Sequence, residues 1–142
     1  MKTVLAARSL CGSARRAGFA VTICERTVNE PFGDLLAALA LEHPDVIGFP
    51  CYLWNIALVR ELCVELRKIL PRVYLCLGGP EVSFCAEKVL RELPEADFVL
   101  SGEGEESFPA LLGALAAGRL PGNVPGLWFR EAGAVRAAAP AA

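Results

Sequence analysis

The sequence predicts one α/β domain built on a doubly wound, five-stranded parallel sheet with helices on both faces. Three observations support this prediction. Short apolar runs alternate with amphipathic stretches, the runs are continuously apolar, and prolines stand just before several of them. Of the 142 residues, 54% are hydrophobic and 21% are charged, which excludes disorder and lets one domain bury a sizeable core.

Five apolar runs are predicted to be the strands. They are Lys2–Ala7, Ala20–Glu25, Val46–Phe49, Val73–Leu77 and Phe98–Leu100. Continuous apolar runs suit strands that are covered on both faces, and strands that alternate with helices form parallel sheets through right-handed crossovers. We therefore expect a Rossmann-like sheet in the flavodoxin-like strand order 2-1-3-4-5.

Amphipathic stretches between these runs predict the helices. The clearest one spans residues 56–70, where apolar residues recur at spacings of three and four. Asn55 is placed to cap this helix, and Pro71 is placed to end it. Further helices are expected at Ser9–Arg16 and near Glu105–Ala117. A crossover between parallel strands needs at least about 10 residues, and the connection between the first two predicted strands is hardly longer. The helix at Ser9–Arg16 therefore just fits and leaves almost no loop after the first strand.

The C-terminal part predicts a small β-hairpin. Val124–Arg130 and Ala134–Ala137 are short strand-like segments that flank Gly133. The remaining residues are rich in alanine, so the domain is expected to span residues 1–136 and a linker or tail residues 137–142.

Composition excludes several function classes. The net charge is −2 and the basic residues form no stripe, which argues against nucleic-acid binding. No run of about 18 apolar residues occurs, so we expect no membrane span. The N-terminus lacks a signal-peptide core, so a cytoplasmic protein with free thiols is expected. No pair of cysteines has the C-x-x-C spacing of a local zinc or iron–sulfur site.

Three segments that follow predicted strands are the best candidates for a binding site. In a doubly wound sheet, ligands bind at the carboxyl ends of the strands. Residues at those ends are Pro50–Asn55, Gly78–Ser83 and Ser101–Glu106, which supply aromatic side chains, a bare glycine turn and an acidic glycine turn. Each also has a structural explanation: the aromatic residues could cover the core, the glycines could form a tight turn, and the glutamates could complement a helix N-terminus.

Several familiar chemistries do not match these segments. The glycines after the fifth strand lack the third glycine of a dinucleotide fingerprint, and no G-K-[ST] phosphate loop occurs. The only histidine, His43, precedes the third strand and is expected at the opposite edge of the sheet. A nucleophile at Cys51 would have no local base.

The three segments resemble those of radical S-adenosylmethionine (SAM) proteins that carry a B12-binding domain. The resemblance rests on Asp45–Asn55 (DVIGFPCYLWN), Leu77–Ser83 (LGGPEVS) and Asp97–Glu105 (DFVLSGEGE), in matching order and spacing. It implies a domain that holds cobalamin between its strand ends and a radical SAM catalytic domain, in the same polypeptide or in a partner chain. The implied reaction of the full-length enzyme is of the methyltransferase type.

The resemblance also implies which residues contact cobalamin, along the ends of strands 3, 4 and 5. These are Cys51, Tyr52, Leu53, Trp54, Asn55, Gly78, Gly79, Pro80, Glu81, Val82, Gly102, Glu103 and Gly104. The sequence departs from other cobalamin proteins because it lacks the D-x-H-x-x-G motif that supplies a histidine to cobalt, and relatives carry a longer segment after the first strand. It also lacks C-x-x-x-C-x-x-C, so an iron–sulfur cluster and SAM would belong to a downstream domain and no catalytic centre is expected here.

Two other interpretations stay open at this point. The chain could be a non-enzymatic Rossmann-like interaction module with a degenerate cofactor site, because the connection after the first strand is short. A small enzyme that uses Cys51 or the carboxylates is the weaker option, because no base, metal set or phosphate loop accompanies them.

Overall fold

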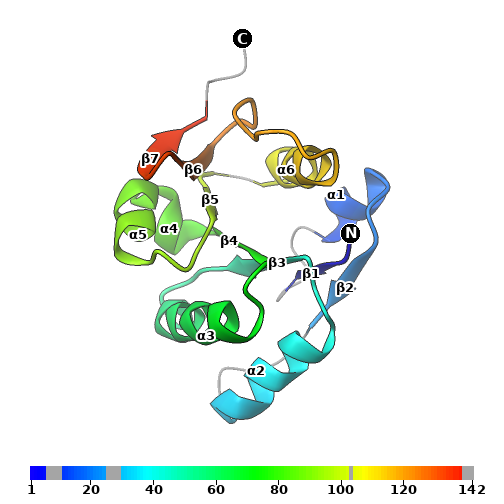
Figure 1. Ribbon diagram of the computed structural model, residues 1–142, viewed down its shortest axis with the longest axis vertical. Helices are drawn as coiled ribbons and strands as arrows, with labels where there is room; N and C mark the ends of the chain where they lie inside the picture. The colour runs from blue at the N-terminus through cyan, green and yellow to red at the C-terminus, as the bar shows by residue number, and fades with distance from the viewer. Residues whose placement is uncertain (6–10, 25–29, 103, 139–142) are drawn as a thin grey trace.

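The domain is a three-layer α/β sandwich (Figure 1). The computed structural model describes residues 1–5, 11–24, 30–102 and 104–138. The strands are β1 (Thr3–Leu5), β2 (Val21–Ile23), β3 (Val46–Pro50), β4 (Tyr74–Gly78), β5 (Phe98–Leu100), β6 (Leu127–Glu131) and β7 (Ala134–Ala137). The helices are α1 (Cys11–Arg16), α2 (Phe32–Leu41), α3 (Ile56–Ile69), α4 (Pro80–Ser83), α5 (Ala86–Glu92) and α6 (Ser107–Ala116).

The described strands form one sheet in the order β2-β1-β3-β4-β5-β6-β7. The first five pair in parallel, which confirms the predicted order 2-1-3-4-5. The predicted C-terminal hairpin is present as β6 and β7, which pair antiparallel. The predicted count of five strands was wrong, because β6 also pairs antiparallel with β5 and the sheet has seven strands. The physical reason is that β5 is fully buried, so its outer backbone groups need hydrogen-bond partners, which β6 supplies.

Helices cover both faces of the sheet and enclose two apolar cores. On one face, α2, α3, α4 and α5 pack on a core that includes Ile47, Leu66 and Leu90. On the other face, α1 and α6 pack on a core that includes Leu5 and Phe108. This arrangement confirms the doubly wound class.

Arg130 on β6 attaches the hairpin to the rest of the fold. Its guanidinium donates hydrogen bonds to the carbonyl oxygens of Ala96 (2.6 Å), Leu90 (2.7 Å) and Leu93 (3.0 Å). Two of these carbonyls lie at the end of α5, where helix carbonyls lack intrahelical partners. The backbone N–H of Ala138 also donates to Leu127 O at 2.7 Å. The division between a domain over residues 1–136 and a tail over 137–142 stays a prediction, and residues 139–142 lie outside the described part.

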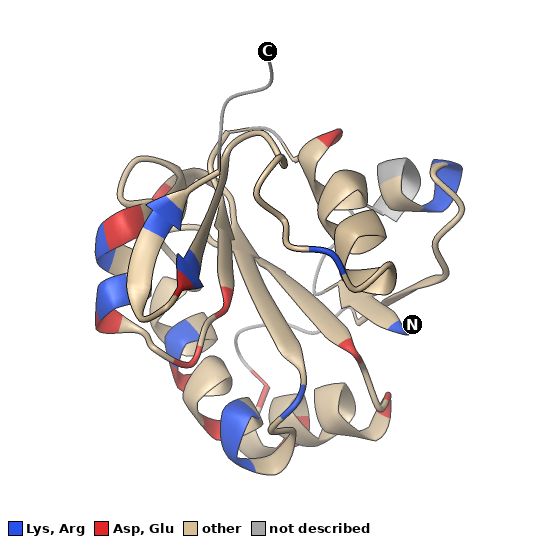
Figure 2. Cartoon of the chain, turned by 45° about the horizontal axis from the view of Figure 1, so that its top comes forward, with Lys and Arg blue, Asp and Glu red and all other residues tan. Residues whose placement is uncertain are grey.

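Charged residues of both signs are interspersed on the helices (Figure 2). Ion pairs such as Arg91–Glu87 and Lys68–Glu65 lie on α5 and α3 and are exposed. Among the described residues, every helix is too short or too polar to span a lipid bilayer.

Replacing Thr3 with valine is expected to stabilise the domain. Thr3 is fully buried in β1, and its hydroxyl oxygen has no hydrogen-bond partner among the residues that the structure describes. Removing a buried unsatisfied hydroxyl at nearly constant volume should raise the free energy of unfolding by about 1 kcal/mol. Urea denaturation of the wild-type and T3V domains measures this difference, and a lower midpoint for T3V at an unchanged m value would contradict the prediction.

Candidate functional site at the carboxyl edge of the sheet

Backbone hydrogen bonds join the turn after β3 to the turn after β4. Cys51 N–H donates to Gly78 O at 2.7 Å, and Glu81 N–H donates to Cys51 O at 3.1 Å. Gly79 lies between them with φ 96° and ψ 177°, a conformation that only glycine adopts readily. A Cβ at this position would lie 2.8 Å from Cys51 O and 2.9 Å from Cys51 N. The glycine is therefore what lets the two turns approach this closely.

A side chain joins the turn after β4 to the turn after β5. Ser83 Oγ donates to Gly79 O at 2.8 Å and accepts a hydrogen bond from Gly102 N–H at 3.1 Å. The three segments predicted to meet at one edge of the sheet do meet there. We call them together the strand-end rim, formed by residues 50–55, 78–83, 101–102 and 104.

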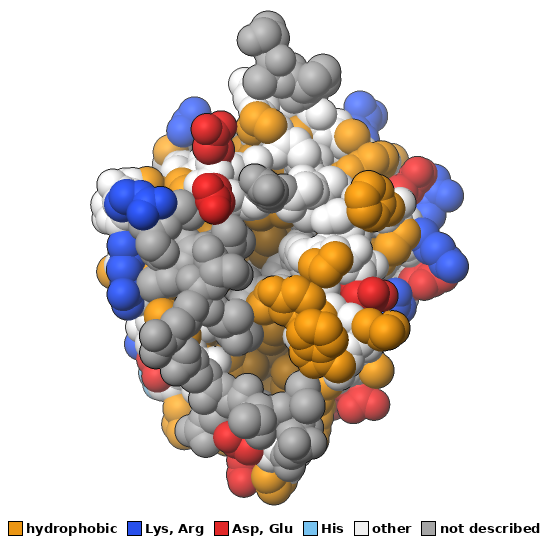
Figure 3. Space-filling view, turned by 180° about the vertical axis from the view of Figure 1, so that it is seen from behind, with side chains coloured by type: hydrophobic (Ala, Val, Ile, Leu, Met, Phe, Trp, Pro, Cys, Tyr) orange, Lys and Arg blue, Asp and Glu red, His pale blue; other side chains and the backbone are white. Residues whose placement is uncertain are grey.

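The strand-end rim surrounds a hollow of about 270 Å³. Its floor is apolar and comes from four strands and α6: Leu5, Gly48, Cys76, Leu100 and Phe108. The rest of the lining comes from Phe49, Glu105 and part of the strand-end rim. The rim residues that line the hollow are Pro50, Tyr52, Gly78, Gly79, Gly102 and Gly104. Figure 3 shows this side of the molecule hollowed near its centre, with hydrophobic side chains gathered on one flank.

Gly48 keeps the hollow open in the middle of the sheet. A Cβ on Gly48 would lie 2.7 Å from Leu5 Cδ2 and 3.4 Å from Phe108 Cζ. Any larger residue would therefore project between β1 and α6, where the floor now lies. The absence of a side chain at position 48 of β3 thus contributes to the depth of the hollow.

Exposed apolar side chains stand beside the hollow. The rings of Tyr52 and Trp54 are stacked, with centroids 4.6 Å apart and planes 4° from parallel. Leu53 is 78% exposed, Trp54 is 71% exposed, and Phe84, directly after α4, is 98% exposed. Exposed large apolar side chains that lie close together often mark a surface that binds a ligand or a partner.

Asn55 shapes the aromatic turn instead of capping α3 with its side chain. It occupies the N-cap position, but its side chain makes no capping hydrogen bond to the helix. Its Oδ1 accepts from Tyr52 N–H at 2.7 Å, and its Nδ2 donates to Pro50 O at 2.8 Å. The side chain therefore holds the turn that carries the stacked rings.

The predicted site residues take different places in the structure. Those that line the hollow are Tyr52, Gly78, Gly79, Gly102 and Gly104. Leu53, Trp54 and Pro80 are exposed residues of the rim, and its residues Asn55 and Glu81 are partly buried. The side chains of Cys51 and Val82 are buried in the core on the α3 face. Glu103 lies outside the described residues.

Sequence reasoning missed the floor and Phe84. The floor residues of β1, β3, β4 and β5 all point to the face covered by α1 and α6. Period-two alternation within each predicted strand could have selected them, since every second residue faces the same side. Phe84 follows the glycine turn by only a few residues, but its exposure depends on the direction in which α4 ends, which has no local signal.

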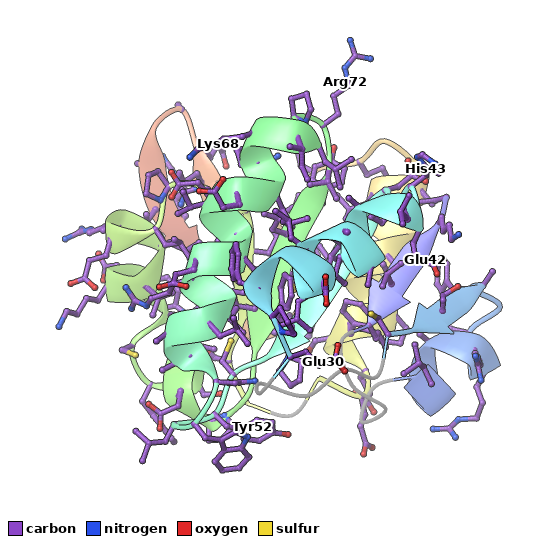
Figure 4. All side chains as sticks on the ribbon, turned by 90° about the horizontal axis from the view of Figure 1, so that it is seen from below. Glu30, Glu42, His43, Tyr52, Lys68 and Arg72 are labelled. Atoms are coloured by element: carbon purple, nitrogen blue, oxygen red, sulfur yellow. The ribbon has the colours of Figure 1, made fainter. Side chains whose placement is uncertain are left out.

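The buried Cys51 thiol at the strand-end rim is a poor nucleophile. Burial raises the pKa of the Cys51 thiol to about 12, because desolvation disfavours the thiolate. Burial also raises the pKa of Cys63 and Cys76. Within the described ranges, no three His, Cys, Asp or Glu side chains gather closely enough to hold a metal ion. In Figure 4, Tyr52 and Glu30 lie at one end of the domain and His43 at the opposite end, as predicted for this histidine.

Fold and site together define a class of protein: a doubly wound α/β domain with an apolar, glycine-lined hollow at the carboxyl ends of its parallel strands. A family model described as the B12 binding domain matches residues 3–112. The chain belongs to this family, and it resembles the B12-binding domains of B12-dependent radical SAM methyltransferases.

Relatives of known name support this placement. The chain is 36% identical over 117 residues to hopanoid C-3 methylase of Methylococcus capsulatus, a match that covers 81% of this chain and 22% of that protein. It is 32% identical over 105 residues to an uncharacterized methyltransferase of Pyrococcus horikoshii, covering 74% and 23% respectively. The chain thus spans less than a quarter of the length of these two relatives.

A solved structure shows the same fold. The radical S-adenosylmethionine methyltransferase TsrM from Kitasatospora setae, with cobalamin and a 4Fe-4S cluster bound, superposes with a TM-score of 0.82 at 18% identity. The match covers 99% of this chain and 29% of that chain. It includes the C-terminal part of the chain, which the family model over residues 3–112 does not reach.

Proposed function

We propose that this domain holds cobalamin across the strand-end rim, for use by a radical SAM catalytic domain in methyl transfer. The observation that supports the proposal most strongly is the apolar hollow at the carboxyl edge, bordered by glycine turns and by exposed aromatic and aliphatic side chains. When bound, cobalamin supplies a cobalt centre that carries a methyl group.

The residues at the rim fit this cofactor. The corrin ring is broad, with apolar faces and amide side chains around its edge, and it is larger than a hollow of about 270 Å³. The ring would therefore lie over the mouth of the hollow, against Trp54 and Leu53, while a smaller part of the cofactor enters between the glycine turns. Gly78, Gly79 and Gly102 place bare backbone beside that entrance, where side chains would block it.

The chain's own residues bind and orient the cofactor and keep water away from it. The stacked rings of Tyr52 and Trp54 form a rigid apolar surface, and Asn55 fixes the turn that presents them. The chain offers no imidazole to cobalt from the rim, because its only histidine, His43, lies at the far end of the domain. We expect a His43→Ala variant to bind cobalamin with unchanged affinity and an unchanged absorbance spectrum.

A radical SAM domain is the proposed partner, in the same polypeptide or in another chain. The relatives and the solved structure are several times longer than this chain, so most of each lies outside the match. Leu53, Trp54 and Phe84 are more exposed than large apolar side chains usually are, and a domain seated over the cofactor would cover them. The iron–sulfur cluster and SAM would be bound by that domain, which would also select the methylated substrate.

Binding of cobalamin is tested by mixing the purified domain with hydroxocobalamin, followed by gel filtration. We expect corrin absorbance to elute with the protein at a defined stoichiometry. A colourless protein peak would contradict the proposal and would favour the alternative of an interaction module without a cofactor.

Replacing Trp54 with alanine is expected to weaken cobalamin binding about tenfold, because partial burial of the indole is worth about 1.5 kcal/mol. Trp54 is 71% exposed, so the melting temperature should hardly change. Fluorescence titration and thermal unfolding measure the two quantities. Leu120→Ala is the matched control, since Leu120 is 79% exposed and lies with Tyr74 and Asp97 at the opposite edge. Equal weakening by both variants would contradict a specific role for Trp54.

A further inference from the structure

The hydroxyl of Ser83 is the link that sets the position of the turn after β5 relative to the turn after β4. Ser83 ends α4 and is partly buried. Its Oγ is engaged in both directions, as a donor to Gly79 O at 2.8 Å and as an acceptor from Gly102 N–H at 3.1 Å. Both glycines line the hollow, so this one side chain spans the gap between two walls of the site.

The strand ladders explain why a side chain is needed here and not between the other two turns. The pairing of β3 with β4 continues to Pro50 and Gly78, so backbone hydrogen bonds reach the rim. The pairing of β4 with β5 stops at Leu77 and Val99. Beyond that point, no other hydrogen bond between described residues connects residues 79–83 with residues 101–104.

Within the described part of the chain, no other tertiary contact of Gly102 would replace this bond. It is exposed, it has φ 79°, and a Cβ built on it meets no atom within 4 Å. Its neighbour Ser101 is held from the other side, because Ser101 N–H donates to Gly126 O at 2.8 Å. Without the Ser83 bond, the turn after β5 would keep its hydrogen bond to Gly126, directly before β6, but would lose its restraint toward the hollow.

We infer that Ser83 is a positioning residue for cobalamin, which fixes the width of the mouth between Gly79 and Gly102 without contacting the reacting atoms. The inference rests on the proposed function, since it assigns a role within the same site. It predicts that the hydroxyl matters for affinity to a greater degree than for global stability, and that threonine, which keeps the hydroxyl, can replace serine.

The test compares Ser83→Ala, Ser83→Thr and Ser107→Ala with the wild-type domain. Ser107 is the matched control, because its hydroxyl also donates to a backbone carbonyl, Pro125 O at 2.6 Å, but it does not line the hollow. We expect Ser83→Ala to weaken hydroxocobalamin binding about five- to tenfold, the equivalent of one hydrogen bond, and Ser83→Thr to restore it to within about twofold. Ser107→Ala should lower the melting temperature and leave the affinity unchanged.

A second measurement separates this inference from the proposed function. Amide hydrogen exchange of Gly102 in the cofactor-free domain should be slow in the wild type and in Ser83→Thr, and at least about tenfold faster in Ser83→Ala, while the amides of β5 stay protected. Failure of the wild type to bind cobalamin would refute the proposed function and the role of Ser83 in it, even with the exchange pattern as expected. Wild-type affinity in Ser83→Ala, loss of affinity in Ser107→Ala, or no rescue by threonine would overturn the inference alone.

Discussion

Replacing Gly79 with alanine is expected to abolish measurable cobalamin binding and to destabilise the domain by about 3 kcal/mol. Two effects act together. The backbone at φ 96° and ψ 177° is strained for any residue with a Cβ, and that Cβ would lie within 3 Å of the N and O atoms of Cys51. The turn after β4 must then move away from the turn after β3, so two walls of the hollow would separate. We expect the affinity for cobalamin to fall by about a hundredfold or more. Urea denaturation and titration with hydroxocobalamin measure the two losses.

Gly118 provides the matched control for this substitution. It also has a positive φ, 68°, but a Cβ there meets no atom within 4 Å, and it lies after α6, away from the strand-end rim. Gly118→Ala should cost about 1 kcal/mol of stability from backbone strain alone and should leave the affinity unchanged. If Gly79→Ala were no more harmful than Gly118→Ala, the close approach of the two turns would not be what the site requires.

Replacing Arg67 with methionine is expected to lower the free energy of unfolding by about 3 kcal/mol, the largest effect we predict at a position far from the site. The Arg67 guanidinium donates to the carbonyl oxygens of Pro71, Val73 and Glu95 and to Asp97 Oδ2 at 2.6 Å. Asp97 Oδ2 also accepts from Leu75 N–H at 2.8 Å. One side chain on α3 thus connects the beginnings of β4 and β5, and its loss leaves partly buried acceptors unpaired.

Arg60→Met is the control for Arg67→Met, because both arginines lie on α3 and methionine preserves the aliphatic part. Arg60 forms a 3.5 Å ion pair with Glu92, and both side chains are more than a third exposed. An exposed pair of this kind contributes at most about 0.5–1 kcal/mol. Thermal unfolding of both variants tests the difference, and similar melting temperatures would show that the Arg67 hydrogen bonds carry little stability. Cobalamin affinity should be nearly unchanged in both folded variants.

Local sequence signals located the parts of the site that depend on strand order. The strand–helix alternation placed Pro50, Gly78 and Ser101 at the carboxyl ends of neighbouring strands, and parallel strands bring such ends to one edge. The same reasoning placed His43 at the other end, where Figure 4 shows it. Helix α3 was also predictable, because a long stripe of apolar residues has only one face to bury.

Contacts between distant segments could not be predicted in this way. The local sequence predicts a two-stranded hairpin for β6–β7. Its addition to the sheet depends on the edge of β5, with which β6 pairs, and on the hydrogen bonds of Arg130 to carbonyls near the end of α5. Asn55 had the right position for a helix cap, yet its side chain bonds within the preceding turn. Both outcomes depend on which hydrogen-bond partners come within reach, and this is decided only when the chain folds.

The sequence by itself determined the fold class, the parallel strand order and the edge at which the site lies. Hydrophobic periodicity and the glycines and prolines that end strands and helices are local signals, because each acts over only a few residues. Only the tertiary structure decided the floor of the hollow, the bond from Ser83 to Gly102, the exposure of Phe84 and the width of the sheet. Those features arise from the distances between side chains and backbone groups far apart in the chain, and such distances are set when the layers pack, not by any one segment.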